Sequence, residues 1–362
     1  MSFYLVIIGI LILFSVVKLG EAKERNLLML FMLFFFGLAT LRAVTVGNDT
    51  WAYSNAFNSI RLGRSLAENK YEVGYFWLNK LIGFFTKEFN IFLGIVDVLV
   101  YYAYYRLIKG YSSNYGLSLL LFLCFGYWGY TVNILRQELA IAMFIYAFLL
   151  ADKGQKCQGF VASIFAPFFQ RTSIAYYLFY FLPKKINKKF YVLSSTVAIV
   201  AVLVVDKILF WMAKYFPKYR GYLLDTSRFK LGRIEPTVVV KCVFLLFVWA
   251  MALYFCNLNK ENLEKIVCKM EIEFQINMIF MASMIMFTAV RFNLLDRCAM
   301  FFNIFVIVLI PNIISLIEQD DIRHLVQTGF IVIAVGYFVV VNVFRPDWNH
   351  IYPYRLFFQI PS

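Results

Sequence analysis

The chain has 362 residues, of which 62% are hydrophobic and only 15% are charged, and its formal net charge is +14. A soluble domain of this size carries far more charge, so the composition excludes an ordinary soluble enzyme and indicates a multi-span membrane protein. A strongly basic balance often marks nucleic-acid binding. Here much of the basic charge lies in short connections between apolar runs, where it sets topology or meets anionic headgroups. We therefore expect membrane lipid as a partner and no nucleic acid.

Apolar stretches long enough to cross a hydrocarbon core of about 30 Å recur along the whole chain. They predict about ten spanning helices, near residues 3–19, 26–46, 90–108, 116–132, 137–151, 190–212, 237–256, 274–292, 298–317 and 323–344. The sequence shows no internal repeat and no soluble domain. The predicted fold class is an all-α polytopic membrane protein, with a single integral membrane domain over residues 1–362.

A polar segment, residues 46–89, follows the second predicted span and begins "VGNDTWAYSNAF". Asp49 in this stretch is either a solvated or turn-forming residue, or a general base or sugar ligand at the mouth of a cavity, with Tyr53 as a hydrogen-bonding neighbour. Glu72 in "YEVGYFWLNK" has the same two interpretations. The spacing of apolar residues over 71–86 predicts an amphipathic helix lying in the membrane interface.

Arg136 begins the predicted helix "RQELAIAMFIYAFLL". A cation at a helix start opposes the helix dipole, so helix formation does not explain this residue. One interpretation is that its side chain reaches the lipid headgroups. The other is a guanidinium that forks onto phosphate oxygens, helped by the amides of the helix N-terminus.

The segment 158–183 contains two apolar pieces, each about half a bilayer long, separated by Gln170, Arg171 and Thr172. Lysines flank it on both sides. The positive-inside rule then predicts a broken or re-entrant hairpin whose tip points away from the cytoplasm. An arginine at that depth is costly and usually lines a polar cavity, so Arg171 and Gln170 are candidate substrate ligands. A single long tilted helix is the alternative.

Two later segments add basic residues. The loop 213–236 is rich in lysine, arginine and tyrosine and includes Arg220 and Arg228. This mixture suits either a diphosphate and sugar rings or lipid headgroups. The motif "RFNLLDR" places Arg291 and Arg297 on either side of Asp296, which can neutralise one arginine and leave the other free.

The distribution of lysine and arginine between the spans predicts the topology. Placing Lys18, Lys23 and Arg25 in the cytoplasm puts the amino terminus outside. Six polar segments then share the outer face, namely 46–89, 133–136, 170–172, 213–236, 291–297 and 345–362. They are expected to surround one cavity. If residues 158–183 cross the membrane once instead, everything after them inverts.

Several motifs of known chemistry are absent from the sequence. It contains no P-loop, no HExxH and no CxxC pairs, and only two histidines, His324 and His350. We therefore expect no ATP coupling, no metal ion and no cofactor.

The order of these motifs resembles that of the EpsG family of Wzy-like exopolysaccharide and O-antigen polymerases. The resemblance rests on "VGNDTWAY", "YEVGYFWLNKLI", "NILRQELAIAMFIYAFLLADKGQK", "APFFQRTS" and "RFNLLDRCAMFF". It implies a GT-C-like, metal-independent glycosyltransferase of the bacterial inner membrane that uses sugars carried on undecaprenyl diphosphate. The implied active site faces the periplasm, and a chain-length regulator is a possible partner protein.

One departure from the family pattern concerns the hairpin tip. Family members commonly have histidine followed by serine or threonine there, whereas this chain has Gln170, which cannot take a proton at neutral pH. Asp49 or Glu72 then inherits the role of base by elimination. The expected catalytic residues are Asp49, Glu72 and Arg136.

The interpretation is an inverting polymerase that joins lipid-linked repeat units. Arginines from several segments, Arg136, Arg171, Arg291 and Arg297, are expected to stabilise the departing diphosphate. A transporter of a lipid-linked oligosaccharide or another anion is the alternative, because broken hairpins and buried arginines suit transport as well. An O-antigen ligase, which uses the same kind of donor, is a weaker alternative.

Overall fold

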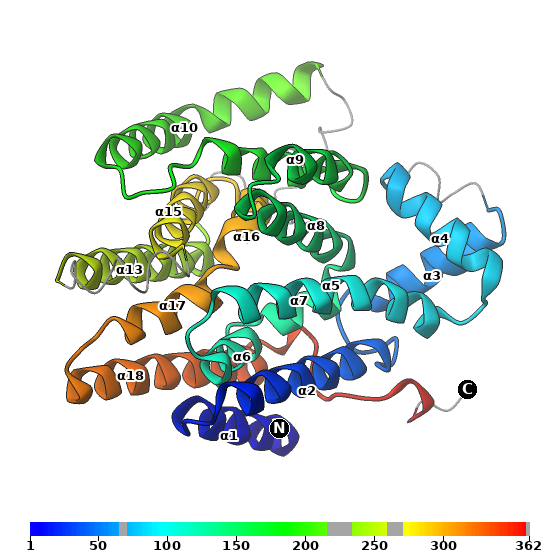
Figure 1. Ribbon diagram of the computed structural model, residues 1–362. Coiled ribbons are helices and arrows are strands. Elements are labelled where there is room, and N and C mark those ends of the chain that lie inside the picture. The colour runs from blue at the N-terminus through cyan, green and yellow to red at the C-terminus, as the bar shows by residue number, and fades with distance from the viewer. Residues whose placement is uncertain (65–70, 216–233, 259–270, 360–362) are drawn as a thin grey trace. The chain divides into compact units, whose positions relative to one another are not determined.

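The computed structural model describes residues 1–64, 71–215, 234–258 and 271–359 (Figure 1). These residues are mostly helical and form no sheet; their one β-type contact is an isolated bridge between Arg42 and Leu356. The predicted all-α class is confirmed. The chain divides into two compact units, a first unit of residues 1–174 and 317–362 and a second unit of residues 175–316.

The first unit contains both ends of the chain. Its helices are α1 (Ser2–Val16), α2 (Glu21–Thr40), α3 (Thr50–Arg61), α4 (Val73–Phe85), α5 (Phe89–Tyr111), α6 (Tyr115–Cys124), α7 (Tyr127–Asn133), α8 (Leu135–Asp152), α9 (Lys156–Ile164) and α18 (Asp320–Val339). Short helical turns follow at η2 (Ala166–Phe168), η6 (Val340–Phe344), η7 (Pro346–Trp348) and η8 (Phe357–Gln359). The 3-10 helix η3 (Arg171–Phe181) begins in this unit and continues into the second.

The second unit is built around α15 (Ile272–Ala289), most of whose residues are buried. Around it lie α10 (Lys188–Tyr215), α13 (Pro236–Leu258), η5 (Asn293–Leu295), α16 (Asp296–Asn303) and α17 (Val306–Ser315). The α15 helix packs against α10, α13, α16 and α17.

Each of the ten predicted span ranges contains a helix or a bent pair of helices. Among the described residues, five helices are long and apolar enough to cross a membrane, and up to seven spans result if each bent pair counts as one. The multi-pass class is therefore confirmed. The α1 helix is shorter, and α2 and α8 begin with charged residues, which keeps these three outside that count.

Two of the predicted spans are bent, whereas each was expected to be one straight helix. The α6 and α7 helices meet at 53° around Phe125 and Gly126, and the backbone of Gly126 is left-handed, with φ of +85°. A left-handed residue cannot continue a right-handed helix. The segment of η5 and α16 meets α17 at 49°, at Ile304 and Phe305, and neither residue is of a helix-breaking type.

The described residues of segment 46–89 form two helices, α3 and α4. The α4 helix confirms the predicted amphipathic pattern, because Tyr75, Asn79 and Ile82 are buried while Trp77 and Leu81 are exposed. The α3 helix was not expected, since its composition is too polar for a span and contains several turn-forming residues.

The hairpin segment 158–183 is broken, as predicted. The α9 helix ends at Ile164, the η2 turn follows, and η3 begins at Arg171 as a 3-10 helix. The alternative of a single long helix over this segment is therefore wrong. The side of the membrane that the tip faces stays a prediction.

A buried ion pair fixes the point where the chain leaves α2. Arg42 Nη1 lies 3.6 Å from Asp97 Oδ2 on α5, and both side chains are completely buried. Arg42 Nε also donates to the Thr50 hydroxyl at the start of α3, at 3.3 Å. The tail pairs beside it, because the Ala43 amide donates to the Arg355 carbonyl at 2.9 Å. These contacts hold the start of segment 46–89 in one position.

Candidate functional site

Arg136 lies where the first turns of three helices meet. Its guanidinium forms an ion pair with Glu72, which precedes α4. The guanidinium carbon lies 5.2 Å from the ring centroid of Tyr71 and 5.9 Å from that of Tyr75. Arg136 also hydrogen-bonds to Tyr53 on α3. We call Arg136, Glu72, Tyr53, Tyr71 and Tyr75 the Arg136 cluster.

The surroundings of Arg136 favour its charged form. Burial alone lowers the pKa of Arg136, but Tyr53 and Glu72 raise it more, and the net result is a pKa above the ordinary arginine value. Its Nε–H is buried and finds no hydrogen-bond partner among the described residues. A buried guanidinium with an unused donor is suited to binding a further anion.

Asp49 precedes α3 and its side chain is exposed. Its carboxylate caps no backbone amide of the helix, so the turn-forming interpretation finds no support. Burial raises the pKa of Tyr71, Arg136 lowers it and Asp49 raises it, which shows that Asp49 lies within electrostatic range of Tyr71. Asp49 is thus near the Arg136 cluster, with its carboxylate open to solvent.

The hairpin tip packs against the starts of α8 and α4. Buried Gln170 donates through Nε2 to the Thr172 hydroxyl at 3.1 Å, and that hydroxyl donates to Gln137 Oε1 at 2.8 Å. At the first turn of α4, a Cβ atom added to Gly74 would lie 2.8 Å from the carbonyl oxygen of Phe168. Only glycine allows this approach. The side chain of Arg171, the next residue after Gln170, is exposed.

A network of amides joins the tail to segment 46–89. The backbone N–H of Asn48 donates to Asn133 Oδ1 at 2.5 Å, and Asn133 Nδ2 donates to the backbone carbonyl of Asn349 at 2.7 Å. Asn48 Nδ2 donates to the carbonyls of Asp347 and Trp348, at 2.9 and 3.0 Å. Four of the six predicted polar segments, 46–89, 133–136, 170–172 and 345–362, therefore meet in the first unit.

Arg291 and Arg297 belong to the second unit. Asp296 there lies within electrostatic range of Lys241 as well as Arg297, and Asn293 Nδ2 donates to Glu235 Oε2 at 2.9 Å. Convergence of these arginines with Arg136 stays a prediction. Arg220 and Arg228 lie outside the described residues.

Sequence reasoning missed several residues of the site. Tyr71 and Tyr75 lie one helical turn apart around the start of α4, a spacing that places both beside the same partner. Gln137 stands in the "RQELA" motif beside Arg136 and carries the contact to the tip. His350 had no local signal, because it reaches the site through the tail, 302 residues after Asn48.

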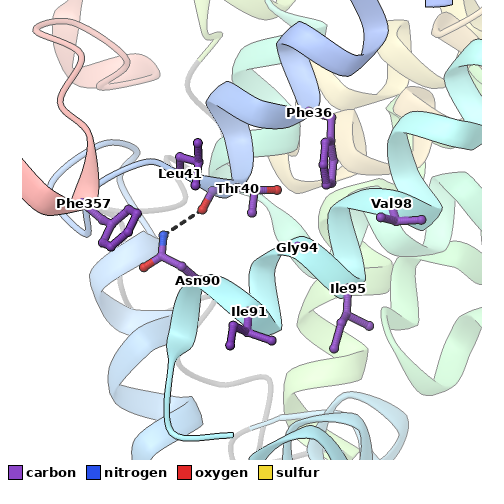
Figure 2. A pocket seen from close by; sticks show the side chains of 9 residues that line it. All are labelled: Phe36, Thr40, Leu41, Asn90, Ile91, Gly94, Ile95, Val98 and Phe357. Atoms are coloured by element: carbon purple, nitrogen blue, oxygen red, sulfur yellow. Dashed lines mark hydrogen bonds between the residues drawn. The ribbon is translucent and has the colours of Figure 1, made fainter.

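An open apolar groove lies between α2 and α5 (Figure 2). Its lining includes Phe36, Leu41, Ile91, Ile95, Val98 and Phe357. At one end, Asn90 Nδ2 donates to the carbonyl of Thr40 at 2.7 Å. Phe92, one turn along α5 from Phe89, packs edge-on against Tyr75 with ring centroids 6.1 Å apart. Phe92 is completely buried and is not among the residues that line the groove.

Fold and site together define a polytopic helical membrane protein with a polar site centred on an arginine. The chain belongs to the EpsG family, whose family model matches residues 25–356, and the resemblance is confirmed. No curated protein and no solved structure matches the chain. Membership in this family supports a general role as a Wzy-like polymerase of polysaccharide biosynthesis.

Proposed function

We propose that this protein is an inverting O-antigen or exopolysaccharide polymerase that joins oligosaccharide repeat units carried on undecaprenyl diphosphate. It works at the outer face of the bacterial inner membrane. The growing chain, linked to the lipid through its reducing-end sugar, is the donor, and a sugar hydroxyl of one further unit is the acceptor. The observation that carries this proposal is the Arg136 cluster, with its charged guanidinium and buried unpaired Nε–H.

Arg136 stabilises the leaving group. When the bond between the anomeric carbon and the diphosphate breaks, negative charge develops on the bridging oxygen, and a fixed donor there contributes roughly 3–4 kcal/mol. Glu72 and the two tyrosine rings hold the guanidinium in place. Because Glu72 is engaged in this ion pair, we assign it to positioning Arg136 and no longer to proton transfer.

Asp49 serves the acceptor. Its exposed carboxylate lies near the cluster and accepts a hydrogen bond from a hydroxyl of the acceptor sugar next to the attacking one. A single displacement, with the hydroxyl attacking as the diphosphate leaves, inverts the anomeric centre.

The apolar groove between α2 and α5 suits the polyprenyl chain of the donor. Its lining is almost wholly aliphatic and aromatic, as a hydrocarbon chain requires.

The test uses cells that lack the gene and receive a plasmid copy. Arg136→Ala is expected to abolish long-chain surface polysaccharide on gels, and single repeat units are expected to accumulate on the lipid. The matched control is Arg106→Ala. The guanidinium carbon of Arg106 also lies over a tyrosine ring, 5.7 Å from the Tyr102 centroid, but this pair lies in the C-terminal half of α5. Arg106→Ala is expected to leave the polymer unchanged.

Three results contradict the proposal. A full polymer ladder with Arg136→Ala at normal protein level removes the role of Arg136. Intermediates trapped on the cytoplasmic leaflet indicate a transporter. Complete polymer that stays on its lipid and never reaches lipid A core indicates a ligase.

A further inference from the structure

The amide of Asn48 determines which nitrogen of His350 carries the proton. His350 Nδ1 lies 3.2 Å from Asn48 Oδ1. The two donor bonds of Asn48 Nδ2, to the carbonyls of Asp347 and Trp348, fix the orientation of the amide, since the reverse orientation would set oxygen against oxygen. An amide oxygen only accepts hydrogen bonds. Nδ1 of His350 is therefore the protonated nitrogen.

The other nitrogen is then a free acceptor. A neutral imidazole carries one proton, so Nε2 keeps its lone pair. The side chain of His350 is exposed, and among the described residues no hydrogen bond occupies Nε2. This is the arrangement of a base whose tautomer is held by a hydrogen bond to the opposite nitrogen.

The backbone of His350 is held in an unfavourable conformation. Its φ is +47°, in the left-handed region that glycine adopts at least cost. Two backbone bonds keep it there, from its own amide to the Pro346 carbonyl and from the Gly47 amide to its carbonyl, both 2.9 Å. These contacts fix the position of the His350 side chain beside Asn48.

His350 belongs to the same surface as the Arg136 cluster. Asn133, three residues before Arg136 at the end of α7, bonds both Asn48 and the residue before His350. Asp49, which follows Asn48, lies within electrostatic range of Tyr71 in the cluster. The histidine thus lies beside the carboxylate that we assign to the acceptor sugar.

We propose that His350 is the general base of the transfer, in the place of the histidine that the hairpin tip lacks. This rests on the function proposed above. Nε2 takes the proton of the acceptor hydroxyl while the oxygen of that hydroxyl forms a bond to the anomeric carbon of the donor. The bond from that carbon to the diphosphate oxygen breaks, and its electron pair leaves with the diphosphate. The imidazolium then returns the proton to water.

Imidazole suits this task because its ordinary pKa of about 6.5 lies near the operating pH. Two acidic residues belong to the same network: Asp49 follows Asn48 in the chain, and the backbone carbonyl of Asp347 accepts from Asn48 Nδ2.

The experiment measures polymer formation in membranes from a deletion strain, with the lipid-linked oligosaccharide that accumulates there as the probe. His350→Gln is expected to lower the rate by 100-fold or more. His350→Gly is expected at normal abundance, because glycine fits the left-handed backbone, and added imidazole is expected to restore part of its activity. The matched control is His324→Gln, since His324 is also exposed but lies at the far end of α18.

The pH profile separates a base from a merely structural residue. The wild-type rate is expected to fall as pH decreases through the imidazole range, and the residual rate of His350→Gln to be flat there. Activity within threefold of wild type, a loss that imidazole does not restore in abundant His350→Gly, or an unchanged acid limb in His350→Gln would overturn the assignment. If Arg136→Ala also keeps full activity, the proposed function fails; if only the histidine variants do, this inference alone fails.

Discussion

Arg42 and Arg136 both lie near helix ends, but their surroundings give them different roles. The side chain of Arg42 is completely buried and faces Asp97. The side chain of Arg136 is 22% exposed, although its Nε–H is buried and unpaired. We therefore assign Arg42 to structure and Arg136 to the substrate. The sequence alone does not distinguish the two roles, because each arginine stands at the end of an apolar run: Arg42 follows one and Arg136 precedes one.

Breaking the Arg42–Asp97 pair is expected to destabilise the protein. Asp97→Leu leaves a buried guanidinium without its partner, at a cost of about 3–5 kcal/mol, whereas the double variant Arg42→Met with Asp97→Leu recovers much of this loss. Thermal unfolding in detergent measures the difference. Asp320→Asn is the control, because the Asp320–Arg323 pair is exposed and contributes about 0.3–0.5 kcal/mol. Equal effects of Asp97→Leu and Asp320→Asn would contradict the structural role of Arg42.

Residue types in local motifs were the predictable part of the site. Asp49, Tyr53, Glu72, Arg136 and Gln170 stand in recognisable stretches, and the structure brings them to one region. His350 was set aside at the level of sequence because it lies in the tail. Its approach to Asn48 depends on a long-range chain path, and no local pattern encodes such a path.

At the scale of helices, hydrophobic length predicted where spans lie but not where they bend. The bend at Gly126 has a visible cause in a left-handed glycine, whereas the bend at Ile304 has none in its residue types. The α3 helix escaped prediction because its stability depends on aromatic contacts with other helices, such as Phe57 against Phe92 at 5.2 Å. Local propensity is a weak guide in such cases.

Close packing of α1 on α6 depends on Gly116. A Cβ atom added there would lie 2.5 Å from the backbone of Phe14 and Ser15, which cannot move without shifting α1. Gly116→Ala is therefore expected to destabilise by about 1–3 kcal/mol. Gly110→Ala is the matched helical control, because nothing lies within 4 Å of its added Cβ atom, and it is expected to be neutral or stabilising by about 0.5–1 kcal/mol. Thermal unfolding in detergent compares them, and equal midpoints would refute this packing.

At the scale of the whole molecule, the proposal requires the Arg136 cluster to face the periplasm. The positive-inside rule predicts that Lys18 lies in the cytoplasm and Arg64 outside. In a cysteine-free background, Arg64→Cys is expected to react with a membrane-impermeant maleimide in intact cells, and Lys18→Cys only after lysis. Both side chains are exposed, so reactivity reports sidedness. The opposite pattern would invert the topology and remove the site from the periplasm.

The central claim is that the Arg136 cluster binds the diphosphate of the lipid-linked donor. The most direct measurement is an electron cryomicroscopy structure of the protein in a lipid nanodisc with undecaprenyl diphosphate. We expect diphosphate density against Arg136 and the hairpin tip. Diphosphate density away from Arg136 would contradict the account.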